Sequence, residues 1–295
     1  MNNVLLLLLF AAFAGGSTPP FVKVALEGFP PFTLLCIRFL LAGLTLLPFV
    51  HKNGELNARA FRALLPAAAI GSINPILLFI ALQFTASSVA PLIYASVPLL
   101  TAVYLNRFRR QPILRNQVFG IALGFSGVAI IILLPFLQAG GTDLRSFAGN
   151  LLIVVSACSF MLYGIFSKDT QQTYRLSPLA LTFYLSLVTL LIALPIATWE
   201  NLRQPLDPAS IGPRQVLAAL EIGLVGTSGF YIAYQKALKL GSELTASLFT
   251  YLQPIATIIF AVLLLGEPIT PAFLLGGTLA VIGAGLASAK KNKFP

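Results

Sequence analysis

Charge is what this sequence lacks most. Asp, Glu, Lys and Arg make up 9% of its 295 residues, whereas a soluble domain carries about 25%. Apolar residues make up 57% of the chain, and its mean hydropathy is +0.89. Water therefore cannot be the main solvent of this fold, and the composition predicts a polytopic membrane protein with the lipid bilayer as a partner. The net charge of +10 belongs to loops, since only Arg38 among the basic residues lies well inside an apolar run.

The groups that enzymes and metal sites need are equally scarce. The single histidine, His51, falls in a loop, and no His, Cys, Asp and Glu cluster has metal-ligand spacing. No Gly-rich phosphate loop follows a strand, and no stretch has the polarity of a nucleotide-binding domain. Cys36 and Cys158 sit inside apolar runs, which argues against a stabilising disulfide. We therefore expect no enzyme activity, no metal, no cofactor and no nucleic-acid partner.

In place of charge, the chain has long apolar runs, each close to the ~20 residues that an α-helix needs to cross a bilayer core. We expect an all-α protein with ten transmembrane helices, at residues 1–22, 31–49, 62–80, 88–105, 113–136, 148–167, 178–199, 215–238, 242–265 and 271–287. Pro19-Pro20, Pro98 and Pro254 should interrupt three of them. Because proline removes a backbone donor, such breaks are costly in a membrane unless a cavity or a motion uses them.

The second half of the chain repeats prolines and glycines of the first half at a shift of 156 residues. The repeated pairs include Pro98 and Pro254, Pro112 and Pro268, Gly120 and Gly276, and Gly127 and Gly283. Five helices per half is an odd number, so the two five-helix repeats must be inverted relative to each other. Inverted repeats are typical of transporters, whose substrate site lies between the halves. We predict a first module at 1–136, a linker at 137–147, a second module at 148–289 and a basic tail at 290–295.

Most lysines and arginines fall in loops on the side of both termini. The opposite side holds only Lys23, Arg145, Arg203 and Arg214. Because basic loops stay in the cytoplasm, both termini are predicted to be cytoplasmic. The expected location is the cytoplasmic (inner) membrane of a bacterium.

Residues 265–270 (LGEPIT), followed by Gly276 and Gly283, resemble the signature of EamA-type carriers in the drug/metabolite transporter superfamily. Residues 25–48 (ALEGFPPFTLLCIRFLLAGLTLLP) resemble the start of the same module. The likeness covers nearly the whole chain as two EamA-like modules. It implies a basket-shaped carrier that moves small metabolites, often outward, by alternating access. Where the first module usually has its own Gly-Glu turn, this chain has Gln111, so a role for two symmetric carboxylates is not expected.

This resemblance implies a cavity lined by polar and aromatic groups on helices 1, 3, 4, 6, 8 and 9. The candidates at central depth are Ser17, Asn74, Tyr94, Tyr163, Tyr231, Tyr234, Thr250 and Gln253. Each alone is equally explained by packing or by an interhelical hydrogen bond, but together they describe a neutral, aromatic-rich pocket. Members that carry sugar phosphates use cavity Lys and Arg, whereas Lys236 and Lys239 here fall at the cytoplasmic end of their helix. We expect a neutral or zwitterionic cargo, an amino acid or related compound, and export.

Arg38 and Glu221 are charges inside apolar runs, ~10 Å and ~9 Å below the outer surface at the helical rise per residue. Their similar depth makes a buried ion pair possible, with snorkelling as the other structural explanation; the functional alternative is a cavity or proton-coupling role for Glu221. Glu267 is expected to complete the N-terminus of the last helix. Pro98 and Pro254 are candidate hinges. A channel or a lipid flippase is the alternative function, and the sequence leaves open the substrate, the driving force and any homo-oligomer.

Overall fold

The computed structural model describes residues 2–112, 115–138, 143–203 and 205–288. These residues form helices joined by short loops, and no strand occurs among them. Eight helical stretches are long and apolar enough to cross a membrane, and two shorter apolar helices, at 118–131 and 274–283, complete ten passes over the described residues. The prediction of an all-α membrane protein with two five-helix repeats is confirmed.

The first half contains five passes. Its helices are α1 (Asn2–Leu26), α2 (Pro31–Lys52), α3 (Ala58–Ala81), α4 (Val89–Tyr94), α5 (Val97–Arg109) and α6 (Arg115–Gln138). The short helices α4 and α5 share one pass, which is broken at Ala95 and Ser96, and Pro98 lies in the first turn of α5. A break near Pro98 is therefore present, as predicted, while its role as a hinge stays a prediction.

The second half repeats this pattern with more interruptions. Its elements are α7 (Leu144–Tyr174), α8 (Pro178–Arg203), η1 (Pro208–Ser210), α9 (Pro213–Gly223), η2 (Leu224–Gly229), α10 (Phe230–Leu240), α11 (Glu243–Ser247), η3 (Leu248–Tyr251), α12 (Gln253–Leu265) and α13 (Pro271–Ser288). Pro254 lies in the first turn of α12, just after the 3-10 turn η3. The ninth pass is thus divided at the position that corresponds to the break in the fourth.

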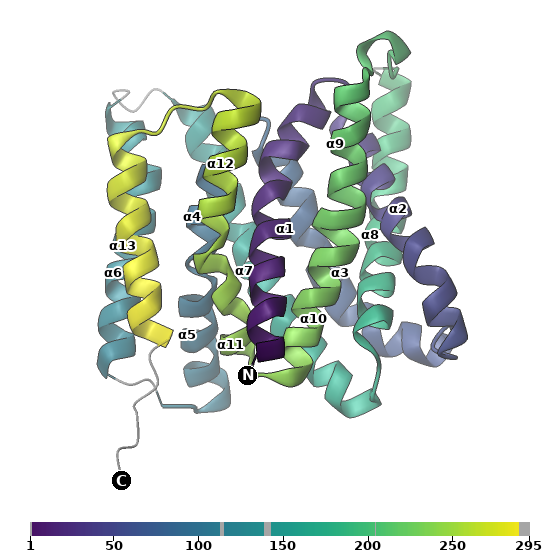
Figure 1. The fold of residues 1–295 in the computed structure, drawn as a ribbon, viewed down its shortest axis with the longest axis horizontal. Coiled ribbons are helices and arrows are strands. Elements are labelled where there is room, and N and C mark those ends of the chain that lie inside the picture. The colour runs from purple at the N-terminus through teal and green to yellow at the C-terminus, as the bar shows by residue number, and fades with distance from the viewer. Residues whose placement is uncertain (1, 113–114, 139–142, 204, 289–295) are drawn as a thin grey trace.

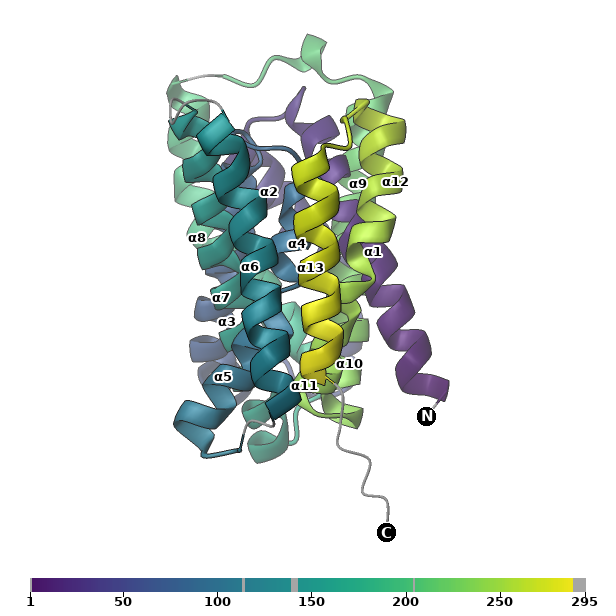
Figure 2. The same cartoon turned by 90° about the vertical axis from the view of Figure 1, so that its left-hand side faces the viewer.

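The two halves interlock. Figure 1 places the start of α1 and the end of α13 at the same end of the bundle, called the terminal end below; the opposite end is called the far end. The strongest helix pairs are α6 with α13, α3 with α7, α2 with α8, and α1 with α12, and each joins one half to the other. Figure 2 shows α6 and α13 side by side along one edge. A site between the repeats is therefore surrounded by helices of both.

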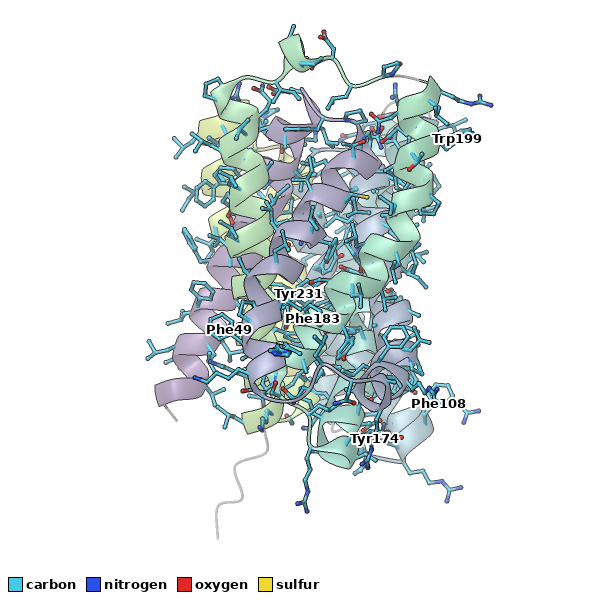
Figure 3. All side chains as sticks on the ribbon, turned by 90° about the vertical axis from the view of Figure 1, so that its right-hand side faces the viewer. Phe49, Phe108, Tyr174, Phe183, Trp199 and Tyr231 are labelled. Atoms are coloured by element: carbon cyan, nitrogen blue, oxygen red, sulfur yellow. The ribbon has the colours of Figure 1, made fainter. Side chains whose placement is uncertain are left out.

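Exposed aromatic side chains mark the two ends of the bundle. Figure 3 shows Trp199 near the far end and Phe108 and Tyr174 near the terminal end, with Tyr231 between them. Trp199 is 56% exposed and Phe108 is 68% exposed, whereas Tyr231 is buried. Because aromatic rings favour the interface between lipid and water, these side chains place the bilayer core between the two ends.

Helix α1 continues through Pro19 and Pro20, so the expected interruption is wrong. A proline cannot donate to the carbonyl four residues earlier, and Pro20 therefore frees the carbonyl of Gly16. Thr257 of α12 donates its hydroxyl to that carbonyl over 2.6 Å. A neighbouring helix thus supplies the hydrogen bond that Pro20 removes, which lets α1 remain regular inside the membrane.

The helix expected at 215–238 is divided by the π-helical segment η2. Two hydroxyls compete with the backbone there: Thr227 donates to the Ile222 carbonyl over 2.6 Å, and Ser228 donates to the Gly223 carbonyl over 3.3 Å. Side-chain bonds of this kind weaken the regular helical ladder, and π segments often occur at functional sites. The sequence argument missed this break because it contains no proline.

Candidate substrate cavity

A cavity lies between the two repeats, with a volume of about 50 Å³. Helices α1, α2, α3 and α4 line it from the first half, and α7, η2, α10, η3 and α12 line it from the second. A single water needs roughly 10–15 Å³ of such volume, so the closed cavity has room for a few waters and no metabolite. The helices around it must separate before a cargo can occupy it.

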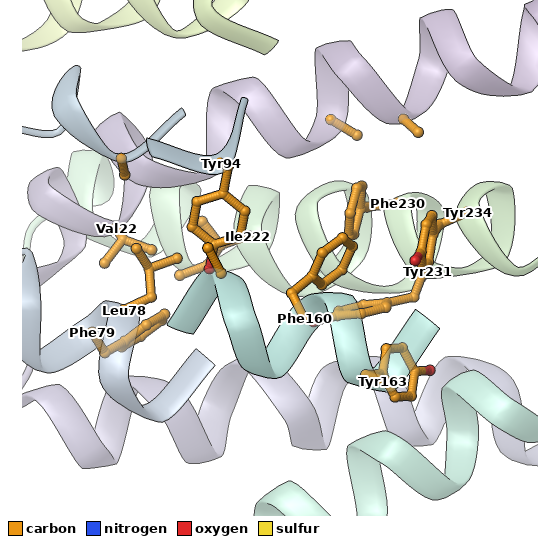
Figure 4. Packing of buried hydrophobic residues seen from close by; sticks show 14 of the residues in the cluster. Val22, Leu78, Phe79, Tyr94, Phe160, Tyr163, Ile222, Phe230, Tyr231 and Tyr234 are labelled. Atoms are coloured by element: carbon orange, nitrogen blue, oxygen red, sulfur yellow. The ribbon is translucent and has the colours of Figure 1, made fainter. Parts of the chain in front are cut away.

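Aromatic rings form one wall of this cavity. Phe160 of α7 packs against Tyr234 at 4.9 Å between ring centroids and against Phe230 and Phe249 at 6.1 Å each. Phe230 and Phe249 meet edge to face at 5.3 Å. Figure 4 shows Phe160, Phe230 and Tyr234 grouped on one side of Tyr94. Rings at these separations attract one another beyond simple area burial and hold a rigid apolar surface.

A polar network forms beside this wall. Asn74 of α3 donates to the carbonyl of Ser156 in α7 over 3.0 Å and also to the hydroxyl of Tyr94 in α4. The Tyr94 hydroxyl lies 2.7 Å from the Ser156 hydroxyl. Asn74, Tyr94 and Ser156 are all buried. Their bonds fix three helices relative to one another, so Asn74 and Tyr94 combine a structural role with their position on the cavity.

Of the eight predicted cavity residues, four line the cavity: Asn74, Tyr94, Tyr231 and Gln253. The other four are buried but are not among the residues that line it, and their role in binding a cargo stays a prediction. They are Ser17, which donates to Glu221; Thr250, which donates to the Ser247 carbonyl; Tyr163, which packs against Tyr231; and Tyr234, which packs against Phe160.

Arg38 lines the cavity but does not pair with Glu221. Its Nε donates to Thr227 Oγ1 over 2.6 Å, and its Nη2 donates to the Gly226 carbonyl over 3.2 Å. Glu221 instead accepts the hydroxyl of Ser17 over 2.6 Å. No ion pair within 4 Å joins Arg38 to Glu221 in the described structure. The predicted ion pair is therefore not formed, because η2 and α1 supply the partners of these two side chains.

Glu267 closes the far end of the bundle. It accepts bonds from the backbone and hydroxyl of Ser87 over 2.8 and 2.9 Å, and from those of Ser88 over 3.1 and 2.8 Å. Lys23 Nζ of α1 lies 3.4 Å from the same carboxylate. Burial opposes ionisation, but the four hydrogen bonds outweigh it and lower the pKa of Glu267 from its ordinary 4.5. The carboxylate therefore satisfies donors at the start of α4, rather than completing α13 as expected.

A related contact closes the terminal end. Lys168 of α7 donates to the Gly241 carbonyl over 2.7 Å, and its Nζ lies 3.3 Å from Glu243 Oε2. Arg109, at the end of α5, pairs with Asp169 beside it. Each end thus joins a lysine on the first helix of one repeat to a glutamate of the second half. These two contacts, Lys23–Glu267 and Lys168–Glu243, are called closures below; the first joins the two halves, and the second lies within the second half.

Several lining residues were missed from the sequence. Phe160, Phe230 and Phe249 give no signal in an apolar chain, since the same residues also face lipid or fill ordinary cores. Gly15 and Thr18 line the cavity from α1, where the sequence argument considered only Ser17 as a cavity residue. No group of three or more metal-ligating side chains was found in the part of the chain that the structure describes.

The comparisons with known proteins agree on one family. The EamA-like transporter family matches residues 2–133 and 147–289. An uncharacterized transporter of Archaeoglobus fulgidus is 24% identical over 99% of both chains. The uncharacterized inner membrane transporter YedA of Escherichia coli K12 is 26% identical over 95% of this chain and 89% of its own. A crystal structure with 17% sequence identity superposes with a TM-score of 0.65 over 97% of both chains, which supports the fold alone.

Proposed function

This chain belongs to the EamA-like transporter family and is a membrane transporter, and from that premise we propose what it carries and how. The cargo is a small neutral or zwitterionic metabolite, an amino acid or a related compound. It moves outward across the cytoplasmic membrane by alternating access. The observation that carries this proposal is the cavity between the repeats, which has an aromatic wall and several polar side chains in its lining.

The two closures supply a mechanism for alternating access. Breaking Lys168–Glu243 would open the cavity toward the terminal end, and breaking Lys23–Glu267 would open it toward the far end. The helix breaks before Pro98 and Pro254 lie on the passes that carry cavity residues, so bending there would widen the cavity. With only one closure open at a time, cargo exchanges with one side of the membrane and no continuous pore forms.

The terminal end is assigned to the cytoplasm. Figure 1 places the end of α2 and the start of α3 at the same end of the bundle as the start of α1, and the end of α5 lies there too. Lys52 is the last residue of α2, Arg59 and Arg62 lie in the first turns of α3, and Arg107 and Arg109 lie in the last turn of α5. A basic loop resists transfer across the membrane, so this end stays inside. The far end, with Glu267, then faces the outside, and an exporter must receive cargo when Lys168–Glu243 is open.

Counterflow in proteoliposomes tests this function. Vesicles loaded with a high concentration of one unlabelled amino acid should accumulate the labelled form transiently, because a carrier exchanges cargo one for one. The Gln253→Leu variant should slow exchange, while Gln83→Leu, at an exposed position, should not. Ionic conductance without counterflow would identify a channel. Failure of counterflow across amino acids, amines and nucleobases would remove the proposed cargo class.

A further inference from the structure

Arg38 has a buried side-chain nitrogen that makes no hydrogen bond in the described structure. The residue is 4% exposed, and it lines the cavity. Its bonds to Thr227 and Gly226 fix the plane of the guanidinium. Its Nη1 is buried and has no hydrogen-bond partner among the described residues. A buried polar group left in this state costs free energy until a partner binds it.

Arg38 also has no carboxylate within 4 Å in the described structure, and Glu221 acts on its charge only from a longer distance. The ion pairs of the described structure involve Lys23, Arg109, Lys168 and Arg214. The rings of Phe39 and Phe79 lie 5.3 and 5.5 Å from the Arg38 guanidinium carbon, which favours a cation but offers no acceptor. A charge inside a membrane protein usually pairs or marks a substrate pathway. Arg38 therefore lines the cavity with one buried donor that has no partner among the described residues.

We propose that Arg38 binds the carboxylate of the cargo, so that the cargo must carry a carboxylate even when its net charge is zero. This inference rests on the proposed transport function for its biological meaning, and it narrows the cargo class that function names. A guanidinium is a planar donor whose geometry matches a carboxylate. Because two other bonds already hold its plane, little further ordering is needed when the anion arrives.

Gln253 and the aromatic rings of the cavity indicate which other groups the cargo carries. Gln253 is 7% exposed and lines the cavity, and its Oε1 is buried without a partner in the described structure. An amide oxygen accepts hydrogen bonds, so it suits an N–H group of the cargo. The rings of Phe160, Phe230 and Phe249 provide an apolar wall nearby. Once the helices separate, the lining thus offers groups complementary to a carboxylate, an N–H donor and an apolar or aromatic body.

Matched pairs of ligands test the proposal on the unaltered protein. Purified wild-type protein in detergent is titrated with benzoate and with benzamide, and with phenylalanine and with phenylalaninamide. Each pair has nearly the same size, but only the first member carries a carboxylate. Benzoate and phenylalanine should raise the thermal unfolding midpoint in a saturable way, since a ligand that binds only the folded state stabilises it. The two amides should have little effect.

Variants then assign the effect to one residue. Arg38→Gln should weaken benzoate binding by about 10- to 100-fold, the range expected for hydrogen bonds to a charged group. Arg38→Lys should weaken it less, because lysine keeps the charge and loses the planar fork. Arg62→Gln removes an equal charge from an exposed position and should leave binding unchanged. If Arg38→Gln fails to fold, Arg38→Lys and the wild-type ligand pairs still decide.

Three results would overturn the inference: equal responses to acids and amides, no response to any carboxylate, or undiminished benzoate binding by the Arg38 variants. These results are separable from the test of transport. Carboxylate binding without counterflow would keep the role of Arg38 and remove the proposed carrier function. Full-rate counterflow of a cargo that has no carboxylate would keep the carrier function and remove the role of Arg38.

Discussion

Replacing Glu267 by Gln should destabilise the far end of the bundle. The carboxylate accepts four hydrogen bonds from Ser87 and Ser88, two of them from backbone groups at the start of α4. An amide has one oxygen to accept these bonds, and its NH₂ group would face the remaining donors. The substitution keeps the shape of the side chain, so the result reports on charge and hydrogen bonding rather than on packing.

The expected loss is about 2–4 kcal/mol of unfolding free energy. Hydrogen bonds to a charged group contribute roughly 1.5–3 kcal/mol each, neutral ones roughly 0.5–1.5, and a donor left unsatisfied adds a further cost. The Glu267 side chain is 12% exposed and Lys23 is 27% exposed, so solvent screens the ion pair and it contributes little beyond these bonds. The estimate therefore comes from Ser87 and Ser88 alone.

The dependence of stability on pH in the acid range provides a second test of Glu267. The pKa of Glu267 is lowered in the folded protein, so its stabilising effect is complete above about pH 4.5, the ordinary value of the group. The effect is lost as the pH falls through the lower, folded value. Wild-type protein should therefore lose more stability than Glu267→Gln across that acid range, because the variant has no proton to bind there.

Thermal unfolding in detergent at pH 7, and then at several values below pH 5, measures both effects. Glu27→Gln is the matched control, since Glu27 pairs with Arg214 at a place where both side chains are about half exposed and should contribute less than about 0.5 kcal/mol. Equal midpoints for Glu267→Gln and wild type at pH 7 would refute the account of this site. Parallel acid profiles would refute the account of its ionisation.

Three other substitutions have defined outcomes. Gly283→Leu should lower the unfolding midpoint by the equivalent of about 1–3 kcal/mol or more, because α6 leaves no space there; Gly43→Leu, with nothing within 4 Å, is its control. Thr257→Val should cost about 1–3 kcal/mol in the same assay by leaving the Gly16 carbonyl unsatisfied, and no change would contradict that reading of α1. Glu221→Gln should flatten the pH dependence of counterflow if the carboxyl exchanges a proton, and an unchanged profile would exclude that role.

The passes and their repeat could be predicted because they depend on patterns along one chain. Apolar runs locate the helices, and repeated glycines locate a close contact. A Cβ added at Gly276 would lie 2.7 Å from the Gly127 carbonyl, and one added at Gly283 would lie 2.6 Å from the Gly120 carbonyl. Both contacts join residues that the repeat shift had already singled out. Small residues at these positions let α6 and α13 approach closely.

The site was less predictable, because rotation about a helix axis decides which residues meet. The rise per residue gives the depth of Arg38 and Glu221 but does not give the direction in which either side chain points. Arg38 donates a hydrogen bond to Thr227, which lies in a π-helical segment that no sequence pattern had predicted. Glu221 accepts a hydrogen bond from Ser17. The partners of Glu267 lie in the other repeat, and no local signal connects them.

The contacts at the two ends of the bundle are unequal, and under the proposed mechanism this difference predicts which end opens more readily. At the far end one carboxylate collects four hydrogen bonds and a lysine, whereas at the terminal end Lys168 has one carbonyl and one carboxylate. A difference of about 1.4 kcal/mol between two openings changes their populations tenfold. Under the proposed alternating access, the empty protein should spend more of its time open toward the terminal end. The conformation open toward the far end would then become populated mainly when cargo is bound.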